Sequence, residues 1–574
     1  MKYNIKNTLR AGALAVVGVL AFASCSDTWD DHYEGSTSSL GESYSGTTMG
    51  YLQSQPNLSD FVAVLKAAGY ESELNDPQVL TVLAPVNGTF NKDSLLSLIS
   101  TGKKKNVVNR FVKNHLMRYN ISLGNQARNV YLLNDKIVNV GTLADNTIQN
   151  RSLSKVNVGC TNGIVHVMGE DLPYQPNLFE FIEDDWDAFK ATLDPGVNPD
   201  TIISLYNYLY KFNTDSLDEH RSVSRGVDLE TGNTIYVDSV MIRNNKALAQ
   251  LGAFLYREDS TYLAILPSQQ AYQQRYEEAK KYFNFNVSFN SEESVRDSIQ
   301  NYYANYFTVC DLFYNMSESM NKKTQNDSLF STVYSRRTWE YNKYLKPFSE
   351  EGILGNYLGK YTCSNGTMYK MNDIPYTKYN NFFKKIVVEA EETRYLETGT
   401  DWTNQQATSI SVRSSSADSI SGSGMAIFSA ASSTRNTEFS YQIPNTLSGK
   451  YDIYVRFLPY QTYGTDTTHV YLPSKFRAAL FERSKTGAMP TSATYSFRTP
   501  DGSRNFVTNP YVIDTVYIGT YEFANSYYST TPGVYFQLSS YVTTSERSSY
   551  TKDMIIDCFL FVPHRDEAEE TTNE

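Results

Sequence analysis

Cysteine and histidine are scarce in this sequence, since its 574 residues include 5 cysteines and 6 histidines. Apart from Cys25, the cysteines lie far apart and form no CxxC pair, which excludes the common zinc-binding spacings. We therefore expect mostly buried free thiols at these positions: Cys160, Cys310, Cys363 and Cys558. The sequence also lacks G-x-S-x-G, H-E-x-x-H, Walker A and dinucleotide-binding motifs, so we predict that the protein is not an enzyme.

Basic residues are also fewer than acidic residues. The chain carries 51 Lys+Arg against 62 Asp+Glu, a net charge of −11. Because binding to phosphate backbones needs a basic surface, this balance excludes nucleic acid as an expected partner. His115 falls on the apolar stripe of an expected helix and His166 in an expected strand, so we predict structural roles for both.

Long apolar runs are absent except for one, residues 11–23. This run is too short for a membrane span and follows basic residues, so it predicts a cleaved export signal over residues 1–24. Ala23 and Ser24 before Cys25 resemble a bacterial lipobox. The resemblance implies a lipoprotein in which Cys25 carries acyl chains such as palmitate, which hold it on a membrane. Residues 25–50 then form a flexible tether.

Acidic residues cluster directly after Cys25. They are Asp27, Asp30, Asp31 and Glu34. This cluster resembles the acidic export tag of Bacteroidota lipoproteins, which implies a place in the outer membrane on the cell-surface face. The alternative is a solvated acidic linker with no targeting role.

Three short patterns recur in the same order along the chain. Residues 56–61 (PNLSDF) recur at 176–181 (PNLFEF), 80–85 (LTVLAP) at 262–267 (YLAILP), and 160–163 (CTNG) at 363–366 (CSNG). Matches in a fixed order predict two copies of one domain. In the first copy, the spacing predicts a helix over 58–68 ending at Gly69, a strand over 80–84, a helix over 107–116 and a hairpin over 156–167.

Three motifs of the first copy resemble a fasciclin-like domain: TVLAPVNGTF at 81–90, NHLMRY at 114–119 and NGIVHVM at 162–168. The resemblance covers residues 51–173, and a divergent second copy covers residues 174–384. The second copy carries two insertions, of which the segment Asp218–Val240 is the leading candidate for a binding loop. We expect the counterpart of His115 near Tyr306–Phe307.

After about Lys385 the composition shifts towards serine, threonine, tyrosine and glycine. Residues 450–457 alternate apolar and polar side chains, and residues 554–562 form a final apolar run. These features predict an all-β sandwich over residues 385–565, followed by an acidic tail over 566–574. The expected fold class is therefore multidomain α+β: two fasciclin-like α/β domains followed by an all-β, jelly-roll-like sandwich.

The ends of this last domain, IVVEAEE at 386–392 and IDCFLFVP at 556–563, resemble carbohydrate-binding modules of family 6 or 35. The resemblance implies a structural calcium ion held by Glu389, Glu391 and Asp557, with no other cofactor required. The alternative is that these carboxylates are surface charges at strand ends. Aromatic and amide side chains in expected loops are candidates for glycan binding, although such rings can also be core residues: Trp402, Asn404, Tyr460 and Tyr463.

Two functional hypotheses remain. In the first, the protein is an outer-membrane surface lipoprotein that binds a glycan (polysaccharide or oligosaccharide) or a partner protein. It would serve polysaccharide utilisation as an accessory of a nutrient-uptake system, with a TonB-dependent importer and its lid lipoprotein as partners. In the second, the fasciclin-like domains act in cell adhesion or in matrix assembly.

Overall fold

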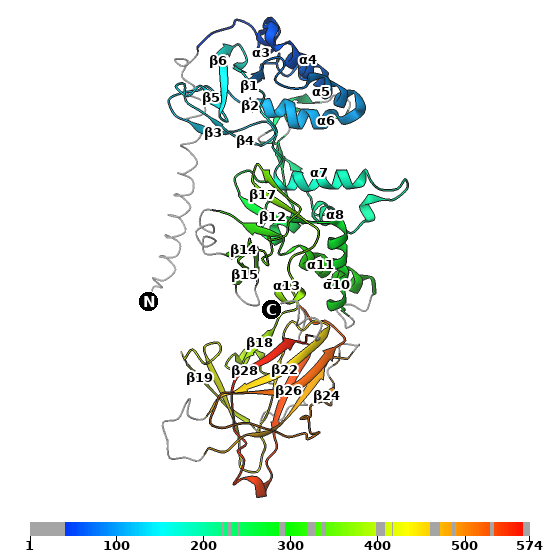
Figure 1. Cartoon of the computed structure of the whole chain (residues 1–574), viewed down its shortest axis with the longest axis vertical. Coiled ribbons are helices and arrows are strands. Elements are labelled where there is room, and N and C mark those ends of the chain that lie inside the picture. The colour runs from blue at the N-terminus through cyan, green and yellow to red at the C-terminus, as the bar shows by residue number, and fades with distance from the viewer. Residues whose placement is uncertain are drawn as a thin grey trace, which may run out of the picture.

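The computed structural model describes residues 41–565 except 221, 228–230, 239, 286–292, 318–327, 336–339, 398–407, 416, 460–470, 485–487, 489 and 529–532. Figure 1 shows three units that follow one another along the long axis of the molecule. Within the described residues, no helix is both long enough and apolar enough to cross a membrane.

The first unit contains one mixed sheet with helices packed on it. The sheet has seven strands in the order β2-β1-β7-β6-β5-β4-β3, and β1 and β7 are parallel. The predicted first helix is α4, which ends at Gly69 with a left-handed φ of 83°. The bounds are α3 (Thr48–Ser54), α4 (Ser59–Ala68), α5 (Lys92–Leu98), α6 (Lys104–Val107), β1 (Leu80–Pro85), β2 (Leu116–Arg118), β3 (Arg128–Tyr131), β4 (Ile137–Val140), β5 (Thr147–Ile148), β6 (Arg151–Cys160) and β7 (Gly163–Met168).

The second unit is built around a six-stranded sheet in the order β15-β14-β13-β12-β17-β16. Its helices are α7 (Leu178–Lys190), α8 (Leu205–Tyr210), α9 (Lys246–Leu251), α10 (Gln269–Tyr282), α11 (Glu293–Val309) and α13 (Lys378–Asn381). Its strands are β8 (Ser216–Leu217), β9 (Val223–Val227), β10 (Thr234–Asp238), β11 (Met241–Ile242), β12 (Tyr262–Pro267), β13 (Phe313–Asn315), β14 (Ser328–Ser335), β15 (Glu340–Leu345), β16 (Gly359–Cys363) and β17 (Gly366–Met371).

The two units share one central arrangement. Strands β2-β1-β7-β6 of the first correspond to β13-β12-β17-β16 of the second, with the same parallel and antiparallel pairings. The register agrees as well, because Leu80 lies opposite Gly163 and Tyr262 lies opposite Gly366. The sequence repeats at 80–85 and 160–163 therefore mark equivalent places in three dimensions.

The Asn-Gly pair of each repeat does more than form a turn. Asn162 accepts a hydrogen bond from Thr48 N and donates to the carbonyls of Leu74 and Asp76. Asn365 does the same in the second unit: it accepts from Leu178 N and donates to the carbonyls of residues 255 and 257. Both asparagines thus tie the start of the first helix to the segment that leads into the central strand.

The glycine that follows each asparagine is required by a close approach of the neighbouring strand. A Cβ atom on Gly163 would lie 2.0 Å from the carbonyl oxygen of Leu80, and one on Gly366 would lie 1.9 Å from that of Tyr262. Both distances are far inside van der Waals contact, so any other residue would force the parallel strands apart.

The third sequence match, of residues 56–61 with 176–181, does not mark equivalent places. The asparagine contacts make Leu178 the counterpart of Thr48, so α7 corresponds to α3. Helix α9, which ends at Gly252 with a left-handed φ of 63°, corresponds to α4. The first insertion of the second unit therefore lies between α7 and α9.

The structure also corrects two other predictions for the second unit, the loop at Asp218–Val240 and the counterpart of His115. Within the segment Asp218–Val240, the described residues include an antiparallel pair of strands, β9 and β10, rather than only a loop. The pairings of β2 with β1 and of β13 with β12 place Leu312, not Tyr306–Phe307, at the position of His115. Leu312 is buried, so an apolar side chain replaces the histidine there.

The third unit is a sandwich of two antiparallel sheets, as predicted. One sheet has the order β19-β20-β28-β22-β26, with β18 paired to β28, and the other has the order β21-β27-β23-β24, with β25 paired to β23. The bounds are β18 (Ile386–Glu389), β19 (Thr408–Ser414), β20 (Gly424–Ala430), β21 (Glu438–Gln442), β22 (Gly449–Phe457), β23 (Lys475–Glu482), β24 (Tyr495–Ser496), β25 (Phe506–Val507), β26 (Asp514–Phe523), β27 (Val534–Ser540) and β28 (Met554–Pro563).

Charged side chains join the first unit to the second. The Lys136 ammonium lies 2.6 Å from Glu180 Oε2 and 2.7 Å from Glu258 Oε1, and all three side chains are largely buried. Arg110 makes a bidentate pair with Asp184, with N–O distances of 2.8 and 2.6 Å. Bidentate and buried charge pairs fix orientation as well as distance, so this junction is specific.

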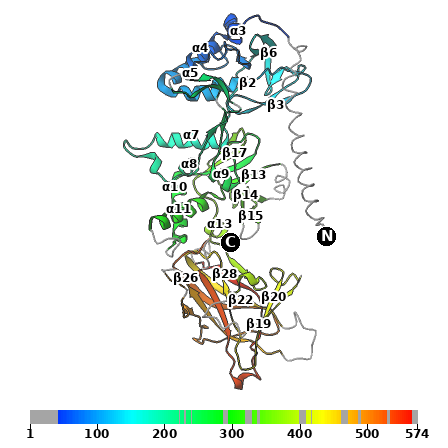
Figure 2. The same ribbon diagram turned by 180° about the vertical axis from the view of Figure 1, so that it is seen from behind.

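Aromatic rings join the second unit to the sandwich. Phe283, which follows α10, packs edge-on against Tyr528 with ring centroids 5.7 Å apart. Backbone hydrogen bonds run from Ser526 N to Asn284 O and from Ser448 N to Tyr282 O, at 2.8 and 3.0 Å. The reverse view in Figure 2 shows the same end-to-end order of the three units.

Candidate functional site

Three carboxylates predicted to form a calcium site do gather in the sandwich. Glu389 ends β18, Glu391 follows two residues later, and Asp557 lies in β28 beside them. The backbone of Ala390 donates to Asp557 O at 2.9 Å, which fixes the strand end against β28. The fold therefore brings together residues that are more than 160 positions apart in the sequence (Glu391 and Asp557).

A tight turn over residues 421–423 holds these side chains. Ser421 donates from its backbone N to Asp557 Oδ1 at 3.0 Å and from its hydroxyl to Glu389 Oε1 at 2.7 Å. The backbone N of Ser423 donates to Glu391 Oε1 at 2.7 Å. Gly422 has a φ of +63°, and a Cβ there would lie 2.5 Å from Glu391 Oε1, so the turn needs glycine.

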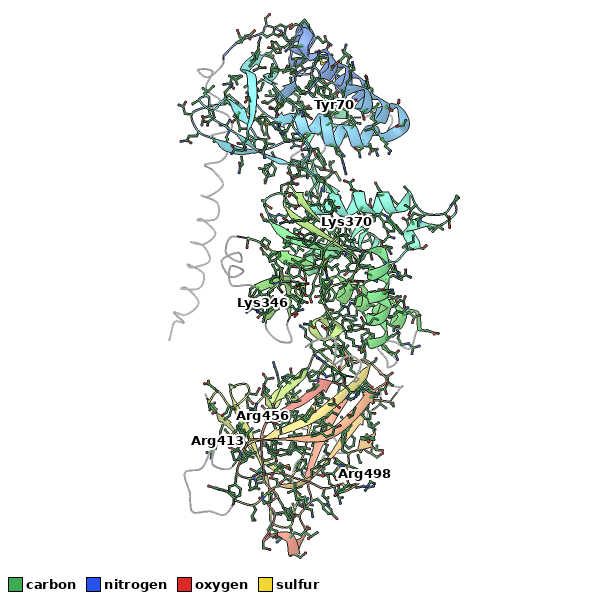
Figure 3. All side chains as sticks on the ribbon, in the orientation of Figure 1. Tyr70, Lys346, Lys370, Arg413, Arg456 and Arg498 are labelled. Atoms are coloured by element: carbon green, nitrogen blue, oxygen red, sulfur yellow. The ribbon has the colours of Figure 1, made fainter. Side chains whose placement is uncertain are left out.

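The cluster is electrostatically unfavourable as it stands. Burial is the main reason that the pKa of Glu389 is raised to about 7, and the neighbouring carboxylates of Glu391 and Asp557 add to the rise. Burial likewise raises the pKa of Asp557, although Arg456 lies 3.4 Å from its Oδ2 and opposes this. Figure 3 labels Arg456 on the sandwich.

Two oxygens of the cluster remain without a hydrogen-bond partner although they are buried: Glu389 Oε2 and Glu391 Oε2. Calcium takes oxygen ligands only, and carboxylate oxygens are its usual protein ligands. The donor chemistry therefore fits a calcium ion. The geometry is not closed around one, because no group of three or more His, Cys, Asp or Glu side chains in the described residues is arranged to hold a metal ion.

The remaining site predictions lie outside the described residues. This holds for the lipidation site Cys25 and for the four glycan-binding candidates Trp402, Asn404, Tyr460 and Tyr463. The structure therefore leaves these residues as sequence predictions.

The cysteines and two histidines behave as predicted. Cys310, Cys363 and Cys558 are buried free thiols, and Cys160 is a partly buried one. His115 bonds Phe111 O through Nδ1 and accepts from Leu172 N at Nε2, while His166 accepts from Asn157 N and bonds Ile121 O. Both rings are fully buried, and burial lowers the pKa of each to about 4. They serve as neutral structural hydrogen-bonding groups.

Sequence reasoning missed the buried ion group at the first junction. Lys136, Glu180 and Glu258 are far apart in the chain, and nothing in their local spacing marks them as partners. Only Glu180 carried a signal, because Asn177 three residues before it forms a capping box at the start of α7.

Comparison with known proteins identifies the first unit. The family model of the fasciclin domain matches residues 56–172, so the chain contains a fasciclin domain there. A search of curated proteins finds no match.

Several solved structures are similar to parts of the chain. A FAS1 domain pair from the insect cell adhesion molecule Fasciclin I is 13% identical over 56% of this chain and 98% of that chain, with a TM-score of 0.19. The CBM35 from Cellvibrio japonicus Abf62 is 12% identical over 32% of this chain and 95% of that chain, with a TM-score of 0.15.

A third similar structure is a Podospora anserina GH26-CBM35 β-(1,4)-mannanase, which is 12% identical over 32% of this chain, with a TM-score of 0.19. The chain spans only 29% of that protein's length. TM-scores this low do not establish a shared overall fold. The chain thus contains a fasciclin domain over residues 56–172, a second unit with the same central strand arrangement, and a β-sandwich.

Proposed function

We propose that this protein is a surface-tethered binding protein of the outer membrane that acts without catalysis. In this proposal Cys25 carries the lipid anchor, the second unit is a divergent fasciclin-like domain, and the sandwich binds a glycan. The protein would work as an accessory of a TonB-dependent importer and its lid lipoprotein.

The observation that supports this proposal best is the order of the units along the molecule. The described chain begins on the first unit, where Gly41 N donates to Asn157 O. The sandwich lies at the opposite end of the row, beyond the second unit (Figures 1 and 2). An anchor that precedes residue 41 would therefore hold the sandwich away from the membrane, where a polymeric ligand can reach it.

The proposed ligands of the sandwich follow from its chemistry. Glu389, Glu391 and Asp557 would hold a structural calcium ion, which would neutralise the two unpartnered oxygens and fix the end of β18. Trp402 and Tyr460 would stack on sugar rings, with Asn404 and Tyr463 beside them. The calcium ion would have a structural role at this end of the sandwich and no catalytic role.

Glycan binding is tested by titrating the full chain with soluble plant and host polysaccharides in affinity electrophoresis. We expect retardation by at least one polysaccharide, reduced for Trp402→Ala and for Tyr460→Ala. Tyr511→Ala is the matched control, because Tyr511 is an exposed tyrosine of the same unit. Retardation that is equal in all three variants would exclude the proposed residues, and no retardation at all would exclude glycan binding.

Adhesion or assembly through the fasciclin-like units is the second candidate function. The observation that favours it is a pair of exposed aromatic side chains on the second unit, Phe348 and Tyr357, which both pack against the Tyr369 ring. Leu345 and Leu358 of the same unit are exposed as well. Exposed apolar groups that cluster on a folded surface are typical of protein contacts. The test is to measure binding of the full chain to cells or matrix before and after the glycans are removed. Equal binding in both cases would favour this second function.

A further inference from the structure

The outer edge of strand β16 in the second unit is open. Strand β16 is the last strand of its sheet and pairs only with β17 among the described residues. Lys360, Tyr361 and Thr362 in its middle are all exposed. A strand edge presents unpaired backbone N–H and C=O groups, which can accept a further strand.

The equivalent edge in the first unit is closed by the chain itself. We call residues 41–46 the strap. The prediction of a flexible tether over residues 25–50 is wrong for residues 41–50, because the strap is hydrogen-bonded to β6 and α3 begins at Thr48. The strap lies along β6 as a parallel addition, with Ser43 opposite Gly159. Four backbone hydrogen bonds hold it, from Gly41 N to Asn157 O, Tyr44 N to Gly159 O, Gly159 N to Glu42 O and Thr161 N to Gly46 O, at 2.8–3.2 Å.

The second unit makes only one of the corresponding backbone contacts. Ser364 N donates to Pro176 O at 3.0 Å, which repeats the bond from Thr161 N to Gly46 O. The residues before Pro176 run to the first unit instead of along β16. Leu172 there bonds the side chains of His115 and Asn114. The covalent link between the units therefore removes the strap that the second unit would otherwise have.

The backbone groups left without a strap can be identified from the register. Gly159, whose N–H and C=O both bond the strap, lies opposite Ile164, and Thr362 lies opposite Thr367 at the equivalent place. Antiparallel pairs alternate, so Lys360, two residues earlier, faces outward as well. Of these groups, Thr362 O accepts a bond from the Gln175 side chain.

The surroundings indicate what kind of strand fits. In the first unit, Tyr44 of the strap packs edge-on against Tyr51 of α3, with ring centroids 5.5 Å apart. The counterpart of Tyr51 is Phe181 of α7, which lies 5.1 Å from the Tyr361 ring at the open edge. An aromatic side chain at the Tyr44 position would therefore find two rings to pack on.

A charge at the Glu42 position would find no partner. Glu42 bonds Lys155, which lies opposite Val167. The residue at this place in the second unit is Gly359, opposite Lys370. Lys370, labelled in Figure 3, already bonds Asp185. An uncharged residue is therefore preferred at this position of an added strand.

We propose that β16 is a docking site for an extended segment of a partner protein, which adds to the sheet as a parallel strand. The segment carries an aromatic residue at the position of Tyr44 and no charge at the position of Glu42. This inference rests on the proposed role of the protein in binding partners. Strand addition supplies affinity through the backbone, and the Phe181–Tyr361 pair supplies selectivity.

The test uses the full chain and a synthetic peptide with the sequence of residues 41–44 of the strap, because Pro176 already occupies the position of Gly46. In this peptide the glutamate is replaced, Glu42→Ser. Hydrogen exchange of the β16 amides is measured with and without peptide. We expect slower exchange over residues 359–363, by about tenfold or more at saturation. A second peptide that also carries Tyr44→Ser should give no slowing, because it lacks the ring.

Two variants of the protein make the test specific. Thr362→Pro removes an outward N–H but no bond to β17, so the protein should fold and lose the peptide effect. Thr362→Ala keeps the N–H and should keep the effect. Equal protection in Thr362→Pro, or no protection in the wild type, would overturn the docking site. Polysaccharide binding, measured on the same samples, depends on the sandwich, so its loss or retention reports on the proposed function separately.

Discussion

Two asparagines have the same structural role in the first two units. Asn162 and Asn365 are both buried, and each makes three hydrogen bonds to backbone groups. One acceptor in each set, the carbonyl of Leu74 or of Leu255, also accepts a backbone N–H. Leaving a buried polar group unpaired costs more than the bond itself contributes, so these residues matter more than a turn residue at the surface.

Asn365→Ala should therefore destabilise the second unit by about 3 kcal/mol, because Leu178 N and the carbonyl of Arg257 lose their partner, while the carbonyl of Leu255 keeps Phe179 N. Urea unfolding followed by tyrosine fluorescence measures the change. Thr362→Ala, an exposed change in the preceding strand, should shift the midpoint very little. A shift of Asn365→Ala no larger than that control would show that water replaces the side chain.

The buried histidines predict loss of stability in acid. The pKa of His115 and of His166 is about 4 in the folded protein, below the usual 6.5, so the unfolded chain binds more protons between these values. The contribution of these histidines to the free energy of unfolding is fully present above about pH 6.5. It falls as the pH drops towards 4, by roughly 3 kcal/mol for each histidine.

Urea unfolding of the first unit at pH 7 and at pH 4.5 tests this sign. His166→Gln should remove about half of the acid-induced loss, whereas His220→Gln, at an exposed position, should leave it unchanged. Stability that rises in acid would contradict the assignment of neutral structural roles.

At the scale of elements, the carboxylate turn of the sandwich should respond to calcium. If Glu389, Glu391 and Asp557 bind the ion, calcium should raise the melting temperature of the sandwich, and a chelator should reverse the effect. Glu389→Gln should abolish most of the response. Glu546→Gln is the control, since Glu546 bonds Lys475 away from the cluster. An equal calcium response in both variants would exclude this site.

Local patterns predicted helices, strands and turns well where the conformation depends on residues close together in the sequence. The alternation in residues 450–457 became β22, with Tyr451, Ile453, Val455 and Phe457 buried, and the run before Pro85 became β1. The Asn-Gly signals marked the hairpin turns because tight turns depend on nearby residues. The Glu-x-Glu and Asp positions met because both strands lie side by side in one sheet.

The same patterns failed where distant contacts decide. The match of residues 56–61 with 176–181 has a helical spacing in both places, but only the partners of Asn162 and Asn365 reveal that Thr48 and Leu178 are equivalent. Neither the strap on β6 nor the open edge of β16 has a local signal, since a strand edge is defined by what lies beside it.

At the scale of the whole molecule, a buried charge group connects the first two units. Although burial acts to raise the pKa of Glu180, the Lys136 ammonium and hydrogen bonds from Asn177 and Tyr174 hold it below its usual value. Glu258 shares the same ammonium. Removing one member of such a group leaves buried charges without a partner, which is strongly destabilising.

Lys136→Met should therefore loosen the junction by about 3 kcal/mol or more while the first unit stays folded. Small-angle scattering should show a broader range of end-to-end distances than in the wild type. Lys155→Met is the matched control, because its pair with Glu42 is exposed and contributes little. An unchanged scattering profile for Lys136→Met would show that Arg110 and Asp184 suffice to orient the units.

We propose above that the protein serves nutrient uptake from the cell surface. The most direct measurement is affinity purification of the full-length chain, through a C-terminal tag, from gently solubilised outer membranes of its native host. We expect recovery together with a TonB-dependent importer and its lid lipoprotein. Recovery alone, or with surface adhesins, would contradict the uptake role and leave adhesion as the function.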